Sequence, residues 1–200
     1  MEWRKRATRV FLWISVLAWG PLLGAKIFDL LVLAGAWSAN PPDSLRLLPY
    51  SADYPVDTGE FFIPSSAALL LASVGALSAG WRTPLSYRGL LAVSAIAIFS
   101  TLVLTVVCFW PMNSALWAYA INSPGNSHSA EEIAMIAHRW VMLDWVRVGA
   151  AAVGFIASIR ALSISYPQER TNADPVYIKI LLAAGLIGVA VFVAYFVSNI

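Results

Sequence analysis

The chain is poor in charged residues. Only 12% of its 200 residues are charged, against about 25% in a typical soluble domain, while 60% are hydrophobic and the mean hydropathy is +0.72. So little polar surface cannot coat a water-soluble globule, which identifies an integral membrane protein. The net charge of +2 gives no indication of a nucleic-acid or strongly acidic partner.

Cysteine and histidine are also scarce, and this argues against several kinds of site. Cys108 is the single cysteine, so it has no partner for a disulfide or a thiolate metal site. The two histidines, His128 and His138, lack the i, i+4 spacing of a helical metal site, and the chain has no HExxH, CxxC or GxSxG motif. Since only His138 lies near a predicted membrane helix, a bis-histidine haem is not expected either. We therefore expect no metal and no other cofactor.

Five apolar runs are long enough to cross a membrane as helices, which requires about 20 residues. They cover residues 10–37, 61–81, 89–110, 131–163 and 176–199. Pro111 is expected to end the third helix and Ser129 to cap the fourth. The first run is too long for the apolar core of a signal peptide and contains Lys26 and Asp29, so we expect it to be retained. These features predict an all-α, polytopic membrane helix bundle in a single domain, residues 1–200.

The distribution of Lys and Arg predicts the orientation of the bundle. The N-terminal segment MEWRKRATR is strongly basic, and the loops predicted on the same side carry further cations. The opposite side has Arg46 as its loop cation, beside several acidic residues. We therefore expect the N-terminus in the cytoplasm. The C-terminus and the two longer loops, about 38–60 and 111–130, are expected outside.

Two pairs of charged residues lie within the predicted spans. Lys26 and Asp29 are three residues apart in the first run, and Asp144 and Arg147 are three apart in the fourth, so each pair can share a helix face. At 1.5 Å per residue, both pairs lie roughly 12–14 Å below the outer end of their helix. Ionisable groups inside a membrane are costly, and each is a candidate functional residue.

Helical phase divides the segment HRWVMLDWVR, residues 138–147. At 100° per residue, Trp140, Asp144 and Arg147 share one face of the helix, whereas His138 and Trp145 share another. The first set is expected to face the bundle. Two interpretations of the charged pairs remain open: they form a site, or they are structural ion pairs that fix the register of the helices.

Three segments resemble one known family. KIFDLLVLAGAWSANPPDSL, FWPMNSAL and HRWVMLDWVRVGAAAVGFIASIRAL resemble the first, third and fourth helix regions of the DUF1772, or anthrone oxygenase-like, membrane proteins. The resemblance spans about residues 20–162 and implies a four-helix core, to which this chain adds a fifth, C-terminal transmembrane helix. The chain departs from the family pattern at Asp144, where Asn is commoner.

The resemblance implies an oxygenase that oxidises an anthrone, or another apolar phenolic or aromatic substrate, with O₂ and without a metal or flavin, in an outer-leaflet pocket. Such chemistry needs a base and a group that stabilises an enolate oxygen. Asp144 or Asp29 is the expected base, Arg147 and Asn113 are expected to hold the oxyanion, and Trp140 is expected to stack on the substrate. The expected catalytic residues are Asp144, Arg147 and Asp29; the expected substrate-binding residues are Trp140, Asn113, Trp37 and Lys26.

Two other functions remain open. The chain could serve as a non-enzymatic accessory subunit or a lipid- or quinone-binding module, and a small transporter is the third alternative. Besides lipid and an apolar aromatic molecule, the expected partner is a second copy of the chain or another subunit bound through the outer loops.

Overall fold

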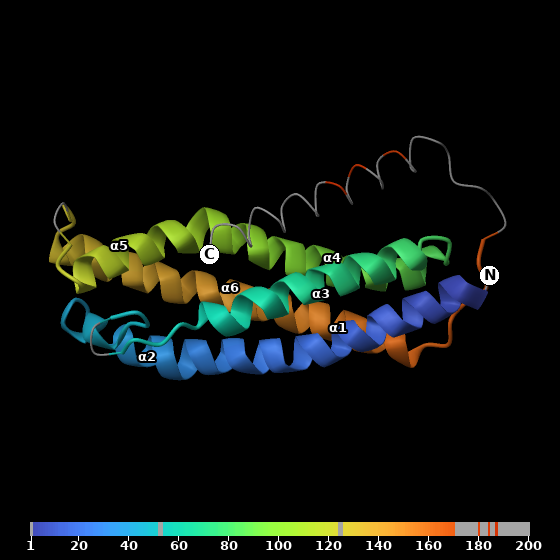
Figure 1. The fold of residues 1–200 in the computed structure, drawn as a ribbon, viewed down its shortest axis with the longest axis horizontal. Helices are drawn as coiled ribbons and strands as arrows, with labels where there is room; N and C mark the ends of the chain where they lie inside the picture. The colour runs from blue at the N-terminus through green and yellow to red at the C-terminus, as the bar shows by residue number, and fades with distance from the viewer. Residues whose placement is uncertain are drawn as a thin grey trace.

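A computed structural model describes residues 2–51, 54–123 and 126–170, together with positions 180, 184 and 187. Its described part is helical and contains no strand (Figure 1). The helices are α1 (Glu2–Phe28), α2 (Ala34–Trp37), α3 (Gly59–Ala79), α4 (Leu85–Leu104), α5 (Trp110–Ala120) and α6 (Ala130–Ser163). The short π-helical turns η1 (Asp29–Leu33) and η3 (Thr105–Phe109) join α1 to α2 and α4 to α5, and the 3-10 turn η2 (Asp43–Leu47) lies in the first loop.

Four continuous helical segments are long and apolar enough to cross a membrane. They are residues 2–37, 59–79, 85–120 and 130–163. The prediction of an all-α membrane helix bundle with a four-helix core is therefore confirmed. The predicted fifth helix, residues 176–199, lies outside the described residues apart from three positions, and the assignment of the chain to a single domain stays a prediction.

The four segments run side by side along one long axis (Figure 1). α1 packs against α3 and α6, and α4 packs against α3 and α6. Buried side chains form three successive clusters, which begin near the start of α1 and end at α2 and α5. Leu12, Tyr87 and Leu91 belong to the first cluster, Trp19, Leu69 and Ile98 to the second, and Trp37, Phe109 and Trp140 to the third.

A buried polar layer joins all four segments in the second cluster. The Ser94 hydroxyl of α4 lies 3.3 Å from Ser73 Oγ of α3 and 2.7 Å from Ser158 Oγ of α6. Trp19 of α1 donates its indole N–H to Ser94 Oγ over 3.2 Å. Small residues let membrane helices approach closely, and their hydroxyl groups form hydrogen bonds between the helices. This layer therefore fixes the register of the bundle.

Pro111 does not end the third helix, and that prediction is wrong. In a regular α-helix, the ring of Pro111 would clash with the carbonyl of Val107. Here the preceding turn is π-helical, and the Trp110 N–H bonds to Thr105 O, five residues back. The wider turn accommodates the proline, so α5 continues to Ala120 and the expected loop 111–130 shortens to residues 121–129.

The predicted cap of α6 is present. Ser129 Oγ accepts a hydrogen bond from the Glu132 N–H over 3.2 Å, and Glu132 Oε2 accepts one from the Ser129 N–H over 2.8 Å. This reciprocal arrangement is a capping box. It starts α6 at Ala130 and so fixes how far Trp140, Asp144 and Arg147 lie from the end of the helix.

Candidate functional site

The polar stripe of α6 faces the bundle interior as helical phase predicts. Trp140, Asp144 and Arg147 are 7%, 1% and 7% exposed, whereas Trp145 is 53% exposed and His138 is also exposed. The division of the segment into two faces is thus confirmed.

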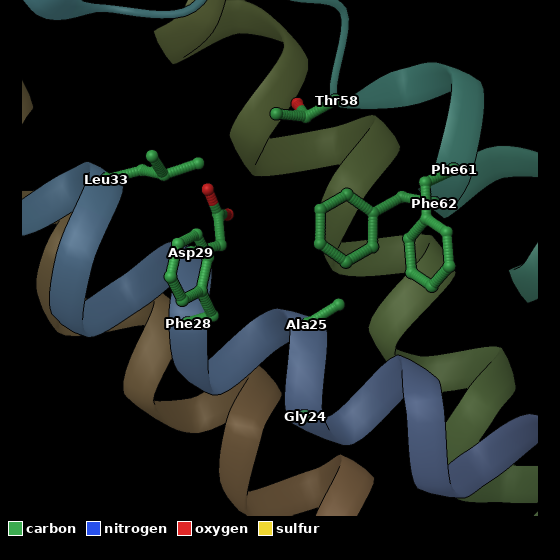
Figure 2. Close-up of a pocket in the computed structure, with 8 residues that line it drawn as sticks. All are labelled: Gly24, Ala25, Phe28, Asp29, Leu33, Thr58, Phe61 and Phe62. Carbon is green, nitrogen blue, oxygen red and sulfur yellow. The ribbon is translucent and has the colours of Figure 1, made fainter.

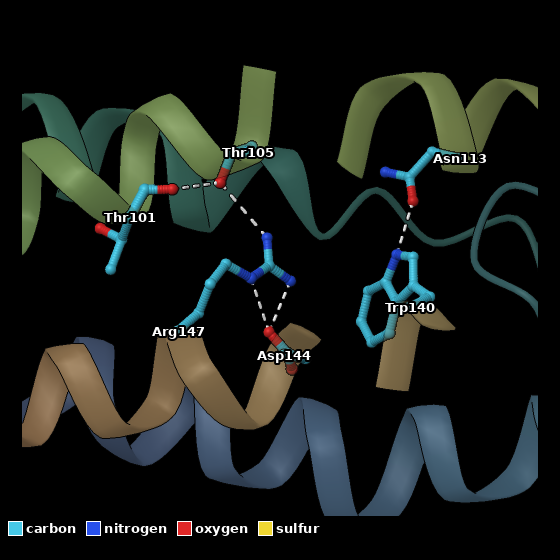
Figure 3. A network of polar contacts seen from close by, with 6 residues as sticks. All are labelled: Thr101, Thr105, Asn113, Trp140, Asp144 and Arg147. Carbon is cyan, nitrogen blue, oxygen red and sulfur yellow. Dashed lines mark hydrogen bonds and ion pairs between the residues drawn. The ribbon is translucent and has the colours of Figure 1, made fainter. Parts of the chain in front are cut away.

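Asp144 and Arg147 form a buried ion pair. Arg147 donates from Nε and Nη2 to the same carboxylate oxygen, Asp144 Oδ1, and each N–O distance is 2.6 Å (Figure 3). Arg147 Nη1 also donates to Thr105 Oγ1 over 3.3 Å, and the Thr105 hydroxyl donates to the carbonyl of Thr101 over 2.8 Å. Within the described residues, Asp144 Oδ2 is buried with no hydrogen-bond partner. The carboxylate therefore keeps one oxygen able to accept a proton or a hydrogen bond.

Aromatic rings complete the surroundings of Arg147. Its guanidinium carbon lies 3.3 Å from the centroid of the Phe109 ring and 5.4 Å from that of Trp140. An aromatic face attracts a cation, most strongly where water is excluded. Thr105 and Phe109 are the first and last residues of η3, so the π-helical turn supplies two of the contacts that stabilise the buried guanidinium.

Trp140 is held within a packed aromatic cluster. Its ring makes edge-to-face contacts with Trp37 and Phe109, with centroid distances of 5.1 and 5.2 Å. Its indole N–H donates to Asn113 Oδ1 over 2.8 Å (Figure 3). Asn113, Trp37 and Trp140 thus join α5, α2 and α6 at one end of the bundle.

Lys26 and Asp29 lie on α1 and η1 beside this ion pair. Lys26 is 8% exposed, and its Nζ lies 5.0 Å from the centroid of the Phe62 ring. Lys26, Asp29, Asp144 and Arg147 interact electrostatically with one another, as expected if the two pairs lie at a similar depth. Lys26 and Asp29 do not, however, form an ion pair within 4.0 Å in the described structure.

Asp29 instead lines a pocket between α1 and α3. The pocket has a volume of about 350 Å³, and Figure 2 shows the Asp29 carboxylate on the α1 side, opposite Phe61 and Phe62. Its lining residues are Gly24, Ala25, Phe28, Asp29, Leu33, Thr58, Phe61 and Phe62. Phe28 and Phe61 are 55% and 43% exposed on the outside of the bundle. The pocket therefore opens on the outside of the bundle, with Asp29 and Thr58 as its polar side chains.

The structure divides the predicted site residues into two groups. In the first group, Asp29 lines the pocket and interacts electrostatically with Lys26, Asp144 and Arg147. Asn113, Trp37 and Trp140 lie in the packed aromatic cluster and are not among the pocket-lining residues.

Sequence reasoning missed the residues that the other helices contribute. Thr105 and Phe109 hold Arg147, and Thr58 and Phe62 line the pocket. Thr105 lies four residues before the FWPMNSAL segment, and Phe109 is the first residue of that segment. This position is the one signal in the sequence that could have drawn attention to them. For metal binding, the described residues contain no group of three or more His, Cys, Asp or Glu side chains placed to hold one ion.

Comparison with known proteins places the chain in a family. Residues 55–157, just over half of the chain, match the family described as anthrone oxygenase. No curated protein and no solved structure matches the chain. The matched segment contains Asn113, Trp140, Asp144 and Arg147, whereas Lys26, Asp29 and Trp37 precede it. The chain belongs to the anthrone oxygenase, or DUF1772, family of membrane proteins.

Proposed function

We propose that this protein is a membrane oxygenase that uses O₂ to oxidise an apolar phenolic or anthrone-like substrate in the pocket between α1 and α3. One observation carries the proposal: a half-buried carboxylate, Asp29, lines an aromatic pocket that opens on the outer surface of a bundle of membrane-spanning helices. An apolar substrate dissolved in the bilayer can reach that carboxylate without crossing water. Membership of the anthrone oxygenase family supports the reaction class.

The proposed reaction requires a base and a positive field. A base removes a proton from the ring CH₂ next to the conjugated carbonyl system, and the resulting enolate gives electrons to O₂. A C–O bond then forms to give a carbon-bound peroxide. Loss of the second ring proton and cleavage of the O–O bond leave a new carbonyl and release water. The anthrone loses two hydrogens and gains one oxygen atom, and the other atom of O₂ becomes water.

We assign the proton transfer to Asp29. It is the carboxylate that lines the pocket, and a correctly placed general base accelerates such a step by about 10²–10⁴-fold. Lys26 lies in the last turn of α1, three residues before Asp29, and over the ring of the pocket-lining Phe62. It supplies positive charge for the developing enolate oxygen. Asp144 is a second possible proton acceptor, since its Oδ2 has no hydrogen-bond partner in the described structure.

In this proposal, three residues do not contact the substrate but hold other groups in place: Arg147, Trp140 and Asn113. Arg147 is engaged by Asp144, Thr105 and Phe109, and its charge adds to the field at the pocket without contact with the substrate. The Trp140–Asn113 hydrogen bond holds α5 against α6 and so keeps Phe109 over the guanidinium.

The test is Asp29→Asn, compared with Asp43→Asn in the outer loop. Asp43 is exposed and takes no part in the pocket, so it is a matched control for loss of one carboxylate. Purified protein in lipid nanodiscs is supplied with a hydroxylated anthrone, and O₂ consumption and quinone absorbance are followed above the uncatalysed rate. We expect Asp29→Asn to lower turnover by about 10² or more and Asp43→Asn to leave it unchanged. Equal turnover by the wild type and a folded Asp29→Asn protein would contradict the assignment.

The same pocket favours one second candidate, a binding module for a lipid-soluble quinone or phenol. Seven of its eight lining residues have no charge, and it is open on the lipid side, which suits storage or presentation of a ligand as well as catalysis. A purified protein that binds the anthrone but consumes no O₂ would support this alternative.

We further propose that this pocket lies in the outer leaflet. The support is the excess of Lys and Arg at the opposite end of the bundle, at the start of α1 and in the segment between α3 and α4. Accessibility of cysteines introduced in the 38–58 loop to a membrane-impermeant thiol reagent on intact cells tests this orientation.

A further inference from the structure

A second pocket lies at the basic end of the bundle, away from Asp29. It has a volume of about 330 Å³ and lies between the first turns of α1 and the segment that follows α6. Its lining residues are Lys5, Arg9, Leu162, Ser163, Ile164, Ser165 and Tyr166. Unlike the first pocket, it combines two cationic side chains with hydroxyl groups.

Arg9 shows how this pocket is built. The guanidinium is half-buried, and its Nη1 donates to Leu162 O over 2.7 Å and to Ile164 O over 3.2 Å. These carbonyls belong to the last turn of α6 and the residue that follows it, where a helix carries partial negative charge. Arg9 therefore neutralises that end of α6 and holds it against α1, which leaves the neighbouring Lys5 as the cation available to a ligand.

Lys5 is exposed, and no carboxylate of the described residues lies within 4.0 Å of its ammonium. The hydroxyls of Ser163 and Ser165 are also exposed. Tyr166 donates its own O–H to Glu169 Oε1 over 2.8 Å, and Glu169 does not line the pocket. Ser163 already donates its O–H to Arg160 O over 2.9 Å. The ammonium of Lys5 and the hydroxyl of Ser165 therefore remain as donors at the pocket, and they suit an anion.

The position of the pocket identifies the kind of anion. α6 ends at Ser163, and the run of α1 without charged residues begins at Val10. Lys5 and Ser165 therefore lie at the level of the lipid headgroups, while Leu162 and Ile164 offer apolar surface on the same wall. Basic pockets at this level bind phosphate-bearing headgroups.

We propose that the pocket formed by Lys5, Arg9 and residues 162–166 binds the phosphate of an anionic phospholipid. Lys5 and the Ser165 hydroxyl contact the phosphate, and Leu162 and Ile164 contact the first part of the lipid chains. This site is separate from the α1–α3 pocket, and the proposal does not depend on any enzymatic activity.

Lys5→Gln tests the site, and Arg6→Gln is its matched control. Arg6 is the next residue of α1 and is also exposed, but it does not line the pocket. Both variants therefore lose one positive charge at the same end of the molecule. The full chain, purified in a mild non-ionic detergent, is titrated with phosphatidylglycerol, with phosphatidylcholine and with inorganic phosphate, and bound states are resolved by native mass spectrometry.

We expect phosphatidylglycerol to bind the wild type in preference to phosphatidylcholine. Lys5→Gln is expected to weaken phosphatidylglycerol binding about fivefold, the effect of one cation near an anionic surface, and Arg6→Gln to leave it unchanged. Equal weakening by both variants, or by neither, would overturn the proposal, as would equally tight binding of phosphatidylcholine. Binding of inorganic phosphate that is lost in Lys5→Gln and displaces the lipid would overturn the lipid assignment and show that the source of the phosphate is soluble.

Discussion

The guanidinium carbon of Arg147 lies 3.3 Å from the centroid of the Phe109 ring. Phe109 closes the π-helical turn η3, whose first residue, Thr105, accepts a hydrogen bond from the same guanidinium. The other π-helical turn, η1, begins with Asp29, the carboxylate of the α1–α3 pocket. Single π-helical turns within α-helices are frequent at functional sites. Both π-helical turns of the described residues therefore contribute residues to the neighbourhood of the buried charges.

Removing the cation of the buried pair should destabilise the bundle. Arg147→Met leaves Asp144 buried and unpaired, since Asp144 Oδ1 accepts from Arg147 and Oδ2 has no partner within the described residues. Loss of one member of a buried ion pair costs about 3–5 kcal/mol. We expect a correspondingly lower thermal unfolding midpoint in detergent, and recovery of most of the loss in the double variant Asp144→Leu, Arg147→Met.

Arg139→Met is the control for this prediction. Arg139 lies on the same helix but is exposed, so its replacement removes an equal charge without opening a buried pair. If Arg147→Met were no less stable than Arg139→Met, the pair would contribute nothing to the fold, and the interpretation of Asp144 and Arg147 as structural would fail.

Helical phase and apolar length predicted much of the fold because both are properties of a single helix. The burial of Trp140, Asp144 and Arg147 and the exposure of Trp145 follow from 100° per residue. Ser129 caps α6 because its hydroxyl and Glu132 have the spacing of a capping box. These outcomes need no knowledge of the neighbouring helices.

The rest depended on contacts between helices, which one sequence does not show. In the sequence, nothing distinguishes Thr105 and Phe109 from the rest of an apolar run. The π-helical turn that precedes Pro111 brings them to Arg147. Asp29 has the spacing to pair with Lys26, yet it lines a pocket that exists only because Phe61 and Phe62 of α3 lie opposite. The separation of the aromatic cluster from the pocket is likewise a result of packing.

Gly154→Ala should destabilise the close contact between α6 and α1. A Cβ at Gly154 would lie 2.4 Å from Trp19 Cζ2 and 2.9 Å from the Cβ of Ala97. Trp19 is fully buried and tied to Ser94, so it cannot move away freely. We expect a loss of about 1–3 kcal/mol, measured as a lower unfolding midpoint. Gly149→Ala, on the same helix with no atom within 4 Å of its Cβ, should be neutral or slightly stabilising, and equal midpoints for the two variants would contradict the prediction.

Tyr166 should make the stability of the protein sensitive to alkaline pH. Partial burial, helped by the hydrogen bond to Glu169, raises the pKa of Tyr166 to about 12. Because the folded protein favours the neutral phenol, this stabilisation is complete below the unfolded pKa of about 10 and is lost as pH rises from there to about 12. Unfolding midpoints measured across this range should fall more steeply for the wild type than for Tyr166→Phe. Parallel curves for the two proteins would show that Tyr166 makes no such contribution.

Deletion of one residue tests the role of the π-helical turn η3. Its Trp110 N–H bonds five residues back, so the turn holds one residue more than an α-helical turn. Deleting the exposed Val107 should restore a regular helix while Leu116 keeps its buried face. We expect a folded, monodisperse protein with a lower unfolding midpoint. Thr105 and Phe109 no longer reach Arg147 together, and in the regular helix the ring of Pro111 meets the carbonyl of Val106, now four residues back. Deleting the equally exposed Ile96 from the regular part of α4 should rotate everything beyond it by about 100° and prevent folding. If neither deletion variant folded, or if both had the same unfolding midpoint, η3 would not be a one-residue insertion into the helix. Its role in bringing Thr105 and Phe109 to Arg147 would then be contradicted.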